Sequence, residues 1–242
     1  MANVDAHQPL YIFISGTGIY RCQSVWCEQI RRGPTRGAYA CSAVNHIGLP
    51  PRYIFFMKVD IFNTGKKYDI IYADPPWLYR DTLGGKAMMG ATPYPCMTQD
   101  EIKNLPIHNL AAKDSVLFLW ATMPMLQEAL DTIKAWGFKY KTCAFCWVKQ
   151  NPKNGGIFAG LGHWVQGNAE LCLLATKGHP HRVSKSVKQI VLAPRGRHSE
   201  KPAEVRERIV SLLGEQNRIE LFARQYAEGW DCWGNEAPED KG

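Results

Sequence analysis

From Lys58 onward, short apolar runs alternate with segments in which apolar residues recur at the spacing of an amphipathic helix. This alternation constrains the fold more than any other feature of the sequence, because strands that alternate with helices form a mostly parallel sheet with helices on both faces. The expected strands are 68–73, 115–120, 139–148, 169–175 and 218–223, and the expected helices are 124–136 and 202–213. Residues 98–101 have the spacing of a capping box and predict another helix start. We therefore expect an α/β domain whose ligands bind at the carboxyl ends of the strands.

Residues 1–57 differ from the rest of the chain. They are rich in Gly, Arg, Cys and small residues and show no sustained period of two or 3.6 residues. This composition is compatible with a small accessory segment, a loosely ordered tail, or sequence upstream of the domain. We therefore assign 1–57 to an N-terminal segment of unknown role and 58–242 to the main domain.

The chain has eight cysteines, but no convincing secretory signal would take them to an oxidising compartment, so disulfides are not expected. Cys143 and Cys146 stand three residues apart in an expected strand, where side chains alternate between faces, so we expect them to pack in the core rather than share a metal. Paired spacing typical of structural zinc sites occurs in Cys22, Cys27, Cys41 and His46. No other feature supports zinc, and we expect no metal.

The formal net charge is +7. Lysines and arginines that neutralise phosphates release condensed counterions, so this surplus suits a polyanionic partner such as nucleic acid. A basic surface kept for solubility explains the charge equally well. No apolar run is long enough to span a membrane, so no membrane partner is expected.

The tetrapeptide Asp74-Pro75-Pro76-Trp77 directly follows the expected strand that ends at Ala73. Consecutive prolines fix the backbone, so the motif is at least a rigid turn. At a strand's carboxyl end, however, the carboxylate points into the ligand crevice. There the carboxylate and a proline-region carbonyl can accept hydrogen bonds from an aromatic amine, and the carboxylate stabilises positive charge that develops on its nitrogen. Trp77 offers a ring on which a base can stack.

Further motifs occur after this tetrapeptide in a fixed order. They are Tyr94-Pro-Cys-Met-Thr98, Leu117-Phe-Leu-Trp-Ala-Thr122, Gly162-His-Trp164, Glu170, His198-Ser-Glu-Lys-Pro202, Glu220-Leu-Phe-Ala-Arg224 and Gly229-Trp-Asp-Cys-Trp-Gly-Asn-Glu236. With the tetrapeptide they resemble the MT-A70 family of adenine-N6 methyltransferases. The resemblance covers about Val59 to Glu236, and the compact form is similar to bacterial and bacteriophage DNA-modifying members.

The resemblance implies a Rossmann-like methyltransferase fold in which the catalytic motif precedes the main cofactor-binding strand, 219–223. It implies S-adenosylmethionine as cofactor, the adenine N6 amine as methyl acceptor, double-stranded DNA as partner, and a bacterial cytoplasmic location, with a phage or prophage origin left open. An RNA adenine-N6 methyltransferase and a catalytically silent nucleic-acid-binding subunit remain alternatives. The sequence does not distinguish a monomer from a homodimer.

The resemblance also assigns roles to single positions. Asp74, Pro75, Pro76 and Trp77 correspond to the catalytic motif. The residues implied to hold the cofactor are Asp60, Ile61, Asp74, Lys201, Arg224, Asn235 and Glu236. Those implied to contact the target base are Trp77, Tyr94, Glu170 and Ser199.

Three expected loops flank the crevice, at 78–94, 150–162 and 177–197. The third is dense in basic residues, and a charge run of this kind is usually a solvated face. Beside an adenine-modifying site it becomes a candidate track for the nucleic-acid backbone, formed by Arg182, Lys185, Lys188, Arg195 and Arg197. An adenine in a duplex must leave the base stack to be modified, which costs a few kcal/mol, and the long loops suit that task.

Overall fold

The computed structural model describes residues 58–79, 95–160, 164–196 and 200–235, together with the backbone of 11–15 and 18–22. The chain divides into two units, residues 1–55 and 56–242. In the first unit, β1 (Tyr11–Ser15) and β2 (Gly18–Cys22) form an antiparallel pair. The four residues with the spacing of a zinc site, Cys22, Cys27, Cys41 and His46, fall outside the described residues, except for the backbone of Cys22. No helix among the described residues is long and apolar enough to cross a membrane.

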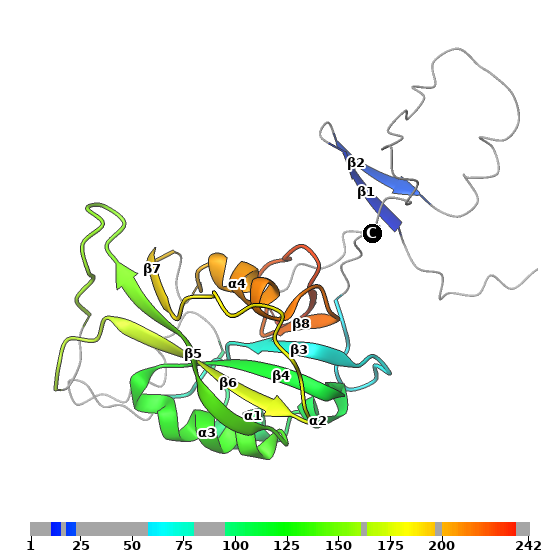
Figure 1. Cartoon of the computed structure of the whole chain (residues 1–242), viewed down its shortest axis with the longest axis horizontal. Coiled ribbons are helices and arrows are strands. Elements are labelled where there is room, and N and C mark those ends of the chain that lie inside the picture. The colour runs from blue at the N-terminus through cyan, green and yellow to red at the C-terminus, as the bar shows by residue number, and fades with distance from the viewer. Residues whose placement is uncertain are drawn as a thin grey trace, which may run out of the picture. The chain divides into compact units, whose positions relative to one another are not determined.

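The second unit is built on a seven-stranded sheet with the order β7-β5-β6-β4-β3-β8-β9 (Figure 1). Its strands are β3 (Tyr68–Ala73), β4 (Ala111–Ala121), β5 (Lys139–Gln150), β6 (Ala169–Lys177), β7 (Ile190–Pro194), β8 (Arg218–Leu221) and β9 (Asp231–Trp233). All neighbouring pairs are parallel except those of β6, which is antiparallel to both β4 and β5. β6 follows β5 without a crossover helix, and a strand that returns without a crossover pairs antiparallel. The predicted mostly parallel sheet is confirmed.

Helices cover both faces of this sheet, as expected from the alternating pattern. α1 (Gln99–Lys103), α2 (Ile107–Leu110), the 3-10 turn η2 (Met123–Met125) and α3 (Leu126–Ala135) lie on one face, and α4 (Glu204–Leu213) lies on the other. Ile102 of α1 and Ile133 of α3 pack with Ile71 and other residues of the first face. Val205 and Ile209 of α4 belong to a separate core on the second face. The fold is therefore a three-layer α/β arrangement of the Rossmann-like type.

Local sequence signals account for where several elements begin and end. Thr98 caps α1 through the predicted capping box, with its hydroxyl accepting from the Glu101 N–H and the Glu101 carboxylate accepting from the Thr98 N–H. β3 has the predicted bounds, whereas β8 ends at Leu221, before the predicted end at 223. The reason is that Phe222 has a φ of 61°, a left-handed conformation that cannot continue a strand.

A buried ion pair fastens α4 to β8. Arg206 Nε and Nη2 donate to the two carboxylate oxygens of Glu220 at 2.6 and 2.7 Å, a bidentate geometry. Glu220 is only 8% exposed, and burial raises the pKa of its carboxyl group while Arg206 opposes that rise. The pair thus allows the charged side chains of Arg206 and Glu220 to lie between α4 and the sheet.

Arg206→Met is expected to lower the free energy of unfolding by about 3–5 kcal/mol, because it leaves the Glu220 carboxylate buried without its counter-charge. Urea unfolding followed by circular dichroism measures the loss. The double variant Arg206→Met/Glu220→Leu is expected to regain most of it, since a well-packed apolar pair can replace a buried ion pair. A double variant no more stable than the single one would contradict this role.

Candidate active site

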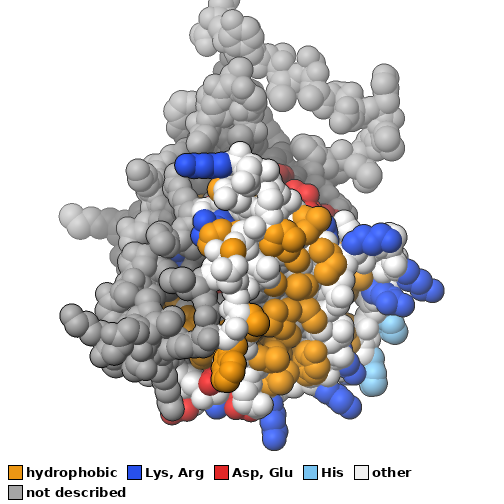
Figure 2. Space-filling model, turned by 90° about the vertical axis from the view of Figure 1, so that its left-hand side faces the viewer, with side chains coloured by type: hydrophobic (Ala, Val, Ile, Leu, Met, Phe, Trp, Pro, Cys, Tyr) orange, Lys and Arg blue, Asp and Glu red, His pale blue; other side chains and the backbone are white. Residues whose placement is uncertain are grey.

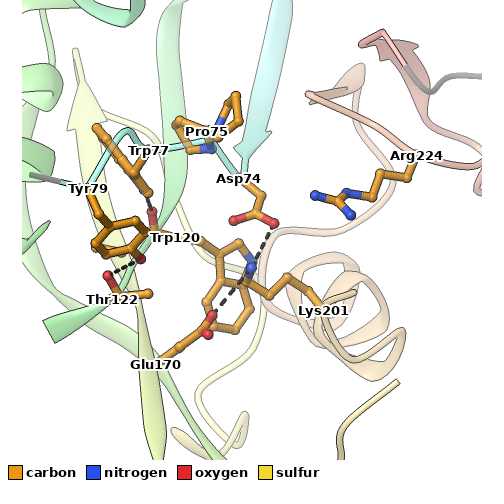
Figure 3. Close-up of a pocket in the computed structure, with 11 residues that line it drawn as sticks. Asp74, Pro75, Trp77, Tyr79, Trp120, Thr122, Glu170, Lys201 and Arg224 are labelled. Carbon is orange, nitrogen blue, oxygen red and sulfur yellow. Dashed lines mark hydrogen bonds and ion pairs between the residues drawn. The ribbon is translucent and has the colours of Figure 1, made fainter. Parts of the chain in front are cut away.

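A pocket lies at the carboxyl ends of β3 and β4, the edge where the sequence predicts the ligand crevice (Figure 3). Its volume is about 120 Å³, below the roughly 300 Å³ at which pockets for whole small molecules usually begin. It therefore has room for one reacting group rather than a complete large ligand. The lining residues are Asp74, Pro75, Pro76, Trp77, Tyr79, Trp120, Ala121, Thr122, Glu170, Lys201 and Arg224.

The turn that carries Asp74 is held by backbone hydrogen bonds on both sides. Pro75 O accepts from the Trp77 N–H at 2.9 Å, and Pro76 O accepts from the Met97 N–H at 2.9 Å. The Trp77 indole N–H also donates to Trp120 O at 3.2 Å, which ties the turn to β4. The rigid turn predicted from the two prolines is present. Both proline carbonyls already accept one bond, so a substrate amine would use a second lone pair.

Trp77 is more deeply buried than its expected stacking role requires. It lines the pocket but is only 6% exposed and packs in the core with Leu119 and Met125. The sequence predicted an open ring face, which this burial does not provide. The main task of Trp77 is to anchor the turn, and a base can contact only the small part of the ring that remains exposed.

Three ionised side chains from separate elements meet beside the turn (Figure 3). Lys201 precedes α4, Asp74 follows β3 and Glu170 is in β6. Lys201 Nζ lies 2.7 Å from Asp74 Oδ2 and 3.3 Å from Glu170 Oε2. The side chains are 9%, 21% and 12% exposed in that order. No hydrogen bond from the described residues occupies Asp74 Oδ1. Lys201 thus orients the carboxylate through one oxygen and leaves the other to face a ligand.

The two carboxylates differ in their tendency to bind protons. Burial raises the pKa of Asp74, and the positive charges of Lys201 and Arg224 offset that rise only in part, while the charge of Glu170 adds to it. Burial also acts to raise the pKa of Glu170, but Lys201 and Lys149 outweigh it, so this pKa is lowered. Glu170 therefore loses its proton more readily than an ordinary glutamate, whereas Asp74 loses its proton less readily than an ordinary aspartate.

Two wall contacts were missing from the site residues assigned on the sequence. The Tyr79 and Thr122 hydroxyl oxygens lie 2.6 Å apart, so the chain after the Asp74–Trp77 turn is bonded to the residue that follows β4. Trp120 is 1% exposed, and its indole N–H donates to Tyr72 OH at 2.7 Å. Its ring centroid lies 5.4 Å from Lys201 Nζ, within range of a cation–π interaction. Trp120 and Thr122 stand inside the motif 117–122, the signal that could have identified them.

The residues expected around a cofactor lie at the same sheet edge but only partly in the pocket. Arg224 lines the pocket with Lys201, and Figure 3 shows its side chain extending toward Asp74. Asn235 follows the carboxyl end of β9. Asp60 lies two residues after Lys58, which forms an isolated parallel β-bridge with Cys232 of β9. Asp60 and Asn235 therefore border this edge beyond the pocket.

Asp60 and its neighbour Ile61 have separate structural tasks. The Asp60 carboxylate accepts from the Phe62 N–H at 3.0 Å and from Asn63 Nδ2 at 2.5 Å, which lowers its pKa. Ile61 is 2% exposed and packs in the core. The side chain of Ile61 is therefore inside, so only its backbone could meet a ligand.

The backbone between β8 and β9 is strained and closely packed. Besides Phe222 with its positive φ, Gly234 approaches so closely that a Cβ there would lie 2.5 Å from Ala223 O. Strain of this kind persists only where the surrounding structure enforces it, and it clusters at functional sites. The position next to Arg224 is consistent with a backbone shaped for a ligand.

The basic stretch between β6 and β7 does not flank the pocket along its whole length. Because β6 is antiparallel to β4, its last residue, Lys177, pairs with Ser115 near the start of β4, at the edge opposite the pocket. Further along, the Val183 N–H donates to Leu212 O near the end of α4 at 2.8 Å. Arg182 therefore lies away from the pocket, and the expected location beside the crevice is wrong for this part.

The same stretch then returns toward the pocket edge through Lys185 and Lys188. Arg195 reaches that edge, where its N–H donates to Gln150 O at 3.2 Å and its guanidinium stacks on the Phe158 ring, 3.4 Å from the centroid. On the face in Figure 2, basic side chains stand along the border of a hydrophobic area rather than in one continuous track.

The expected site residues Tyr94, Arg197, Ser199 and Glu236 lie outside the described residues.

Comparisons with known proteins agree with the resemblance seen in the sequence. The MT-A70 family model matches residues 68–236. The chain is 34% identical over 200 residues to the type II methyltransferase M.MunI of Mycoplasma sp, covering 73% of this chain and 80% of that protein. It is 30% identical over 195 residues to the human N(6)-adenosine-methyltransferase catalytic subunit METTL3, covering 77% of this chain and 31% of that protein. It is 29% identical over 182 residues to the Arabidopsis thaliana N(6)-adenosine-methyltransferase MT-A70-like protein, covering 74% of this chain and 24% of that protein.

Lys201→Met tests the buried charge arrangement without any ligand. Loss of the lysine raises the pKa of Asp74 further above the ordinary value of about 3.9, so the folded state holds more protons than the unfolded one. Where that is so, stability falls as pH rises. The free energy of unfolding of the variant, measured in urea between about pH 4 and 8, should therefore fall more steeply with pH than that of the wild type. Parallel curves would show that Lys201 does not govern the ionisation of Asp74.

Proposed function

Because the chain belongs to the MT-A70 family, we propose that it transfers a methyl group from S-adenosylmethionine to the N6 amine of adenine in DNA. Adenine-N6 methyltransferase activity follows from the family and from its relatives. DNA is favoured because the chain spans 80% of the type II methyltransferase but only 31% of METTL3. The proposed setting is the bacterial cytoplasm.

The observation that carries the proposal is the rigidly held Asp74 carboxylate at the pocket edge. Lys201 fixes Asp74 Oδ2 at 2.7 Å, so Oδ1 can accept a hydrogen bond from an amine placed in the pocket. The second lone pair of a proline carbonyl can accept the other amine hydrogen. Two acceptors set the amine so that its nitrogen lone pair points toward an electrophile, and the carboxylate stabilises the positive charge that develops on nitrogen.

The residues at this edge fit the chemistry of the proposed methyl donor. Lys201 and Arg224 provide cationic groups for its carboxylate, while Asp60 and Asn235 provide oxygen and amide groups for its ribose and adenine. The sequence assigns Glu236, which lies outside the described residues, to the ribose as well. When bound, S-adenosylmethionine supplies a methyl group already activated on a sulfonium. The pocket of about 120 Å³ accommodates the reacting groups, and the remainder of the cofactor would extend along the edge toward β9.

Target recognition is assigned to the remaining residues that the family resemblance implies. Glu170, Tyr94 and Ser199 are proposed to contact the adenine, together with the exposed part of Trp77. Arg195 is proposed to bind a phosphate, because its guanidinium is already oriented on Phe158 and arginine binds phosphate oxygens in a fixed geometry. The contribution of Arg182, Lys185 and Lys188 would come from contacts with the nucleic-acid backbone farther from the target base, and Arg197 is proposed as a further backbone contact.

The proposal is tested by methyl transfer from radiolabelled S-adenosylmethionine to a random-sequence DNA duplex and to RNA transcribed from the same duplex. The wild type is expected to label the DNA in preference to the RNA, with N6-methyladenine as product. Asp74→Asn is expected to lower the rate at least about 10²-fold, the usual effect of removing one group that stabilises transition-state charge. Cofactor affinity, measured by calorimetry, should fall much less than the rate, because Asp74 is only one of the seven residues assigned to the cofactor.

Each alternative has its own outcome in this experiment. Preferential labelling of RNA would assign the chain to RNA adenine methylation. Absence of labelling together with absence of cofactor binding would assign it to a silent binding subunit. An Asp74→Asn variant with the wild-type rate would contradict the role of the carboxylate.

A further inference from the structure

A fourth charged residue extends the arrangement around Asp74 away from the pocket. Lys149 Nζ, in β5, lies 2.5 Å from Glu170 Oε1, while Lys201 lies on the other oxygen of the same carboxylate. The four groups therefore alternate in sign in the order Lys149, Glu170, Lys201, Asp74. We propose that Lys149 is a positioning residue for methyl transfer, which neutralises Glu170 so that Lys201 remains bound to Asp74. This inference rests on the proposed function.

The backbone of β5 delivers Lys149 in a fixed position. The Lys149 N–H donates to Asn168 O at 2.8 Å, and Lys149 O accepts from the Phe158 N–H at 2.8 Å. Its Nζ also lies 5.3 Å from the centroid of the Trp147 ring, within range of a cation–π interaction. The side chain is 22% exposed, so the ammonium group is in contact with the Trp147 ring and Glu170 rather than in open solvent.

The distances around Lys201 show why Glu170 needs a second cation. Lys201 Nζ is nearer to Asp74, at 2.7 Å, than to Glu170, at 3.3 Å. Both carboxylates compete for this single ammonium group, and charges interact strongly where water is largely excluded. With Lys149 on the far oxygen, the attraction of Glu170 for Lys201 is partly satisfied. Without it, Lys201 would be drawn toward Glu170 and away from the carboxylate that holds the amine.

The same change alters how readily the acids bind protons. The charged groups that act on Asp74 are Lys201, Glu170, Arg224 and Glu220, and Lys149 acts on Glu170. Removing Lys149 leaves an excess of negative charge near Asp74, so the folded protein takes up protons at higher pH. A protonated Asp74 is a poorer acceptor for the amine, and methyl transfer should therefore fail at a higher pH than in the wild type.

The test is Lys149→Met, with two readouts. The first readout is the rate of methyl transfer as a function of pH, which falls on the acidic side of the profile, the acid limb. The pH midpoint of this limb is expected to rise by about one unit in the variant, so that at a pH below the midpoints of both proteins its rate is about tenfold lower than that of the wild type. The KM for DNA should stay nearly constant. Independently of activity, the free energy of unfolding should decline more steeply between about pH 4 and 8 than in the wild type, because the folded state binds more protons.

Three control variants isolate the charge of Lys149. Lys149→Arg keeps the charge and should retain the wild-type acid limb. Lys141→Met removes an exposed lysine from the same strand and should leave both readouts unchanged. The double variant Lys149→Met/Glu170→Gln removes both charges and should return the pH midpoint toward the wild-type value even if its maximal rate is lower.

Two results would overturn the inference. One is a Lys149→Met variant whose acid limb and stability slope both match those of the wild type. The other is a higher KM for DNA with an unchanged pH profile, which would make Lys149 a direct substrate contact. If neither wild type nor variant transfers methyl groups, the proposed function fails, while the stability slope still decides whether Lys149 controls the ionisation of the buried acids.

Discussion

The site depends on one buried ammonium group shared by two carboxylates. Lys201 lies within 2.7 Å of Asp74 and 3.3 Å of Glu170, and all three side chains are largely excluded from water. Ionised groups in such a place are stable only when they are paired and hydrogen-bonded. These side chains come from three places in the fold: the residue after β3, the segment before α4 and the start of β6. Their pairing therefore fixes these three places relative to one another. A carboxylate oriented in advance loses little freedom when it binds an amine, which favours transfer.

The reversal of β6 makes this meeting possible. In an all-parallel sheet, residues near the start of a strand lie at the edge opposite the carboxyl ends. Because β6 runs antiparallel to β4, its first residues reach the carboxyl edge and bring Glu170 beside Asp74. The same reversal sends the end of β6 to the opposite edge, so the chain must travel past α4 before Arg195 returns to the pocket side. The antiparallel direction of β6 thus places Glu170 in the site and carries much of the basic stretch between β6 and β7 away from the pocket.

Much of the fold and the centre of the site could be predicted from the sequence, because buried strands, the capping box and the proline turn are local signals. The bounds of β3 and the position of Asp74 followed from such signals. Strands β7 and β9 were missed: β7 is a short edge strand whose Ile190 and Leu192 remain exposed, and β9 has only three residues. The contact of Lys149 with Glu170 depends on the register between β5 and β6, and the burial of Trp77 depends on how its turn packs against β4. A single sequence specifies neither.

The claim that Asp74 grips the adenine amine is tested most directly by a crystal structure with a conjugate in which adenine N6 is joined to an analogue of S-adenosylmethionine. The account predicts N6 within about 3.2 Å of an Asp74 carboxylate oxygen, a normal hydrogen-bond distance, with the cofactor part extending past Arg224 toward β9. A conjugate bound with its N6 remote from Asp74, while the enzyme is active in solution, would contradict the account.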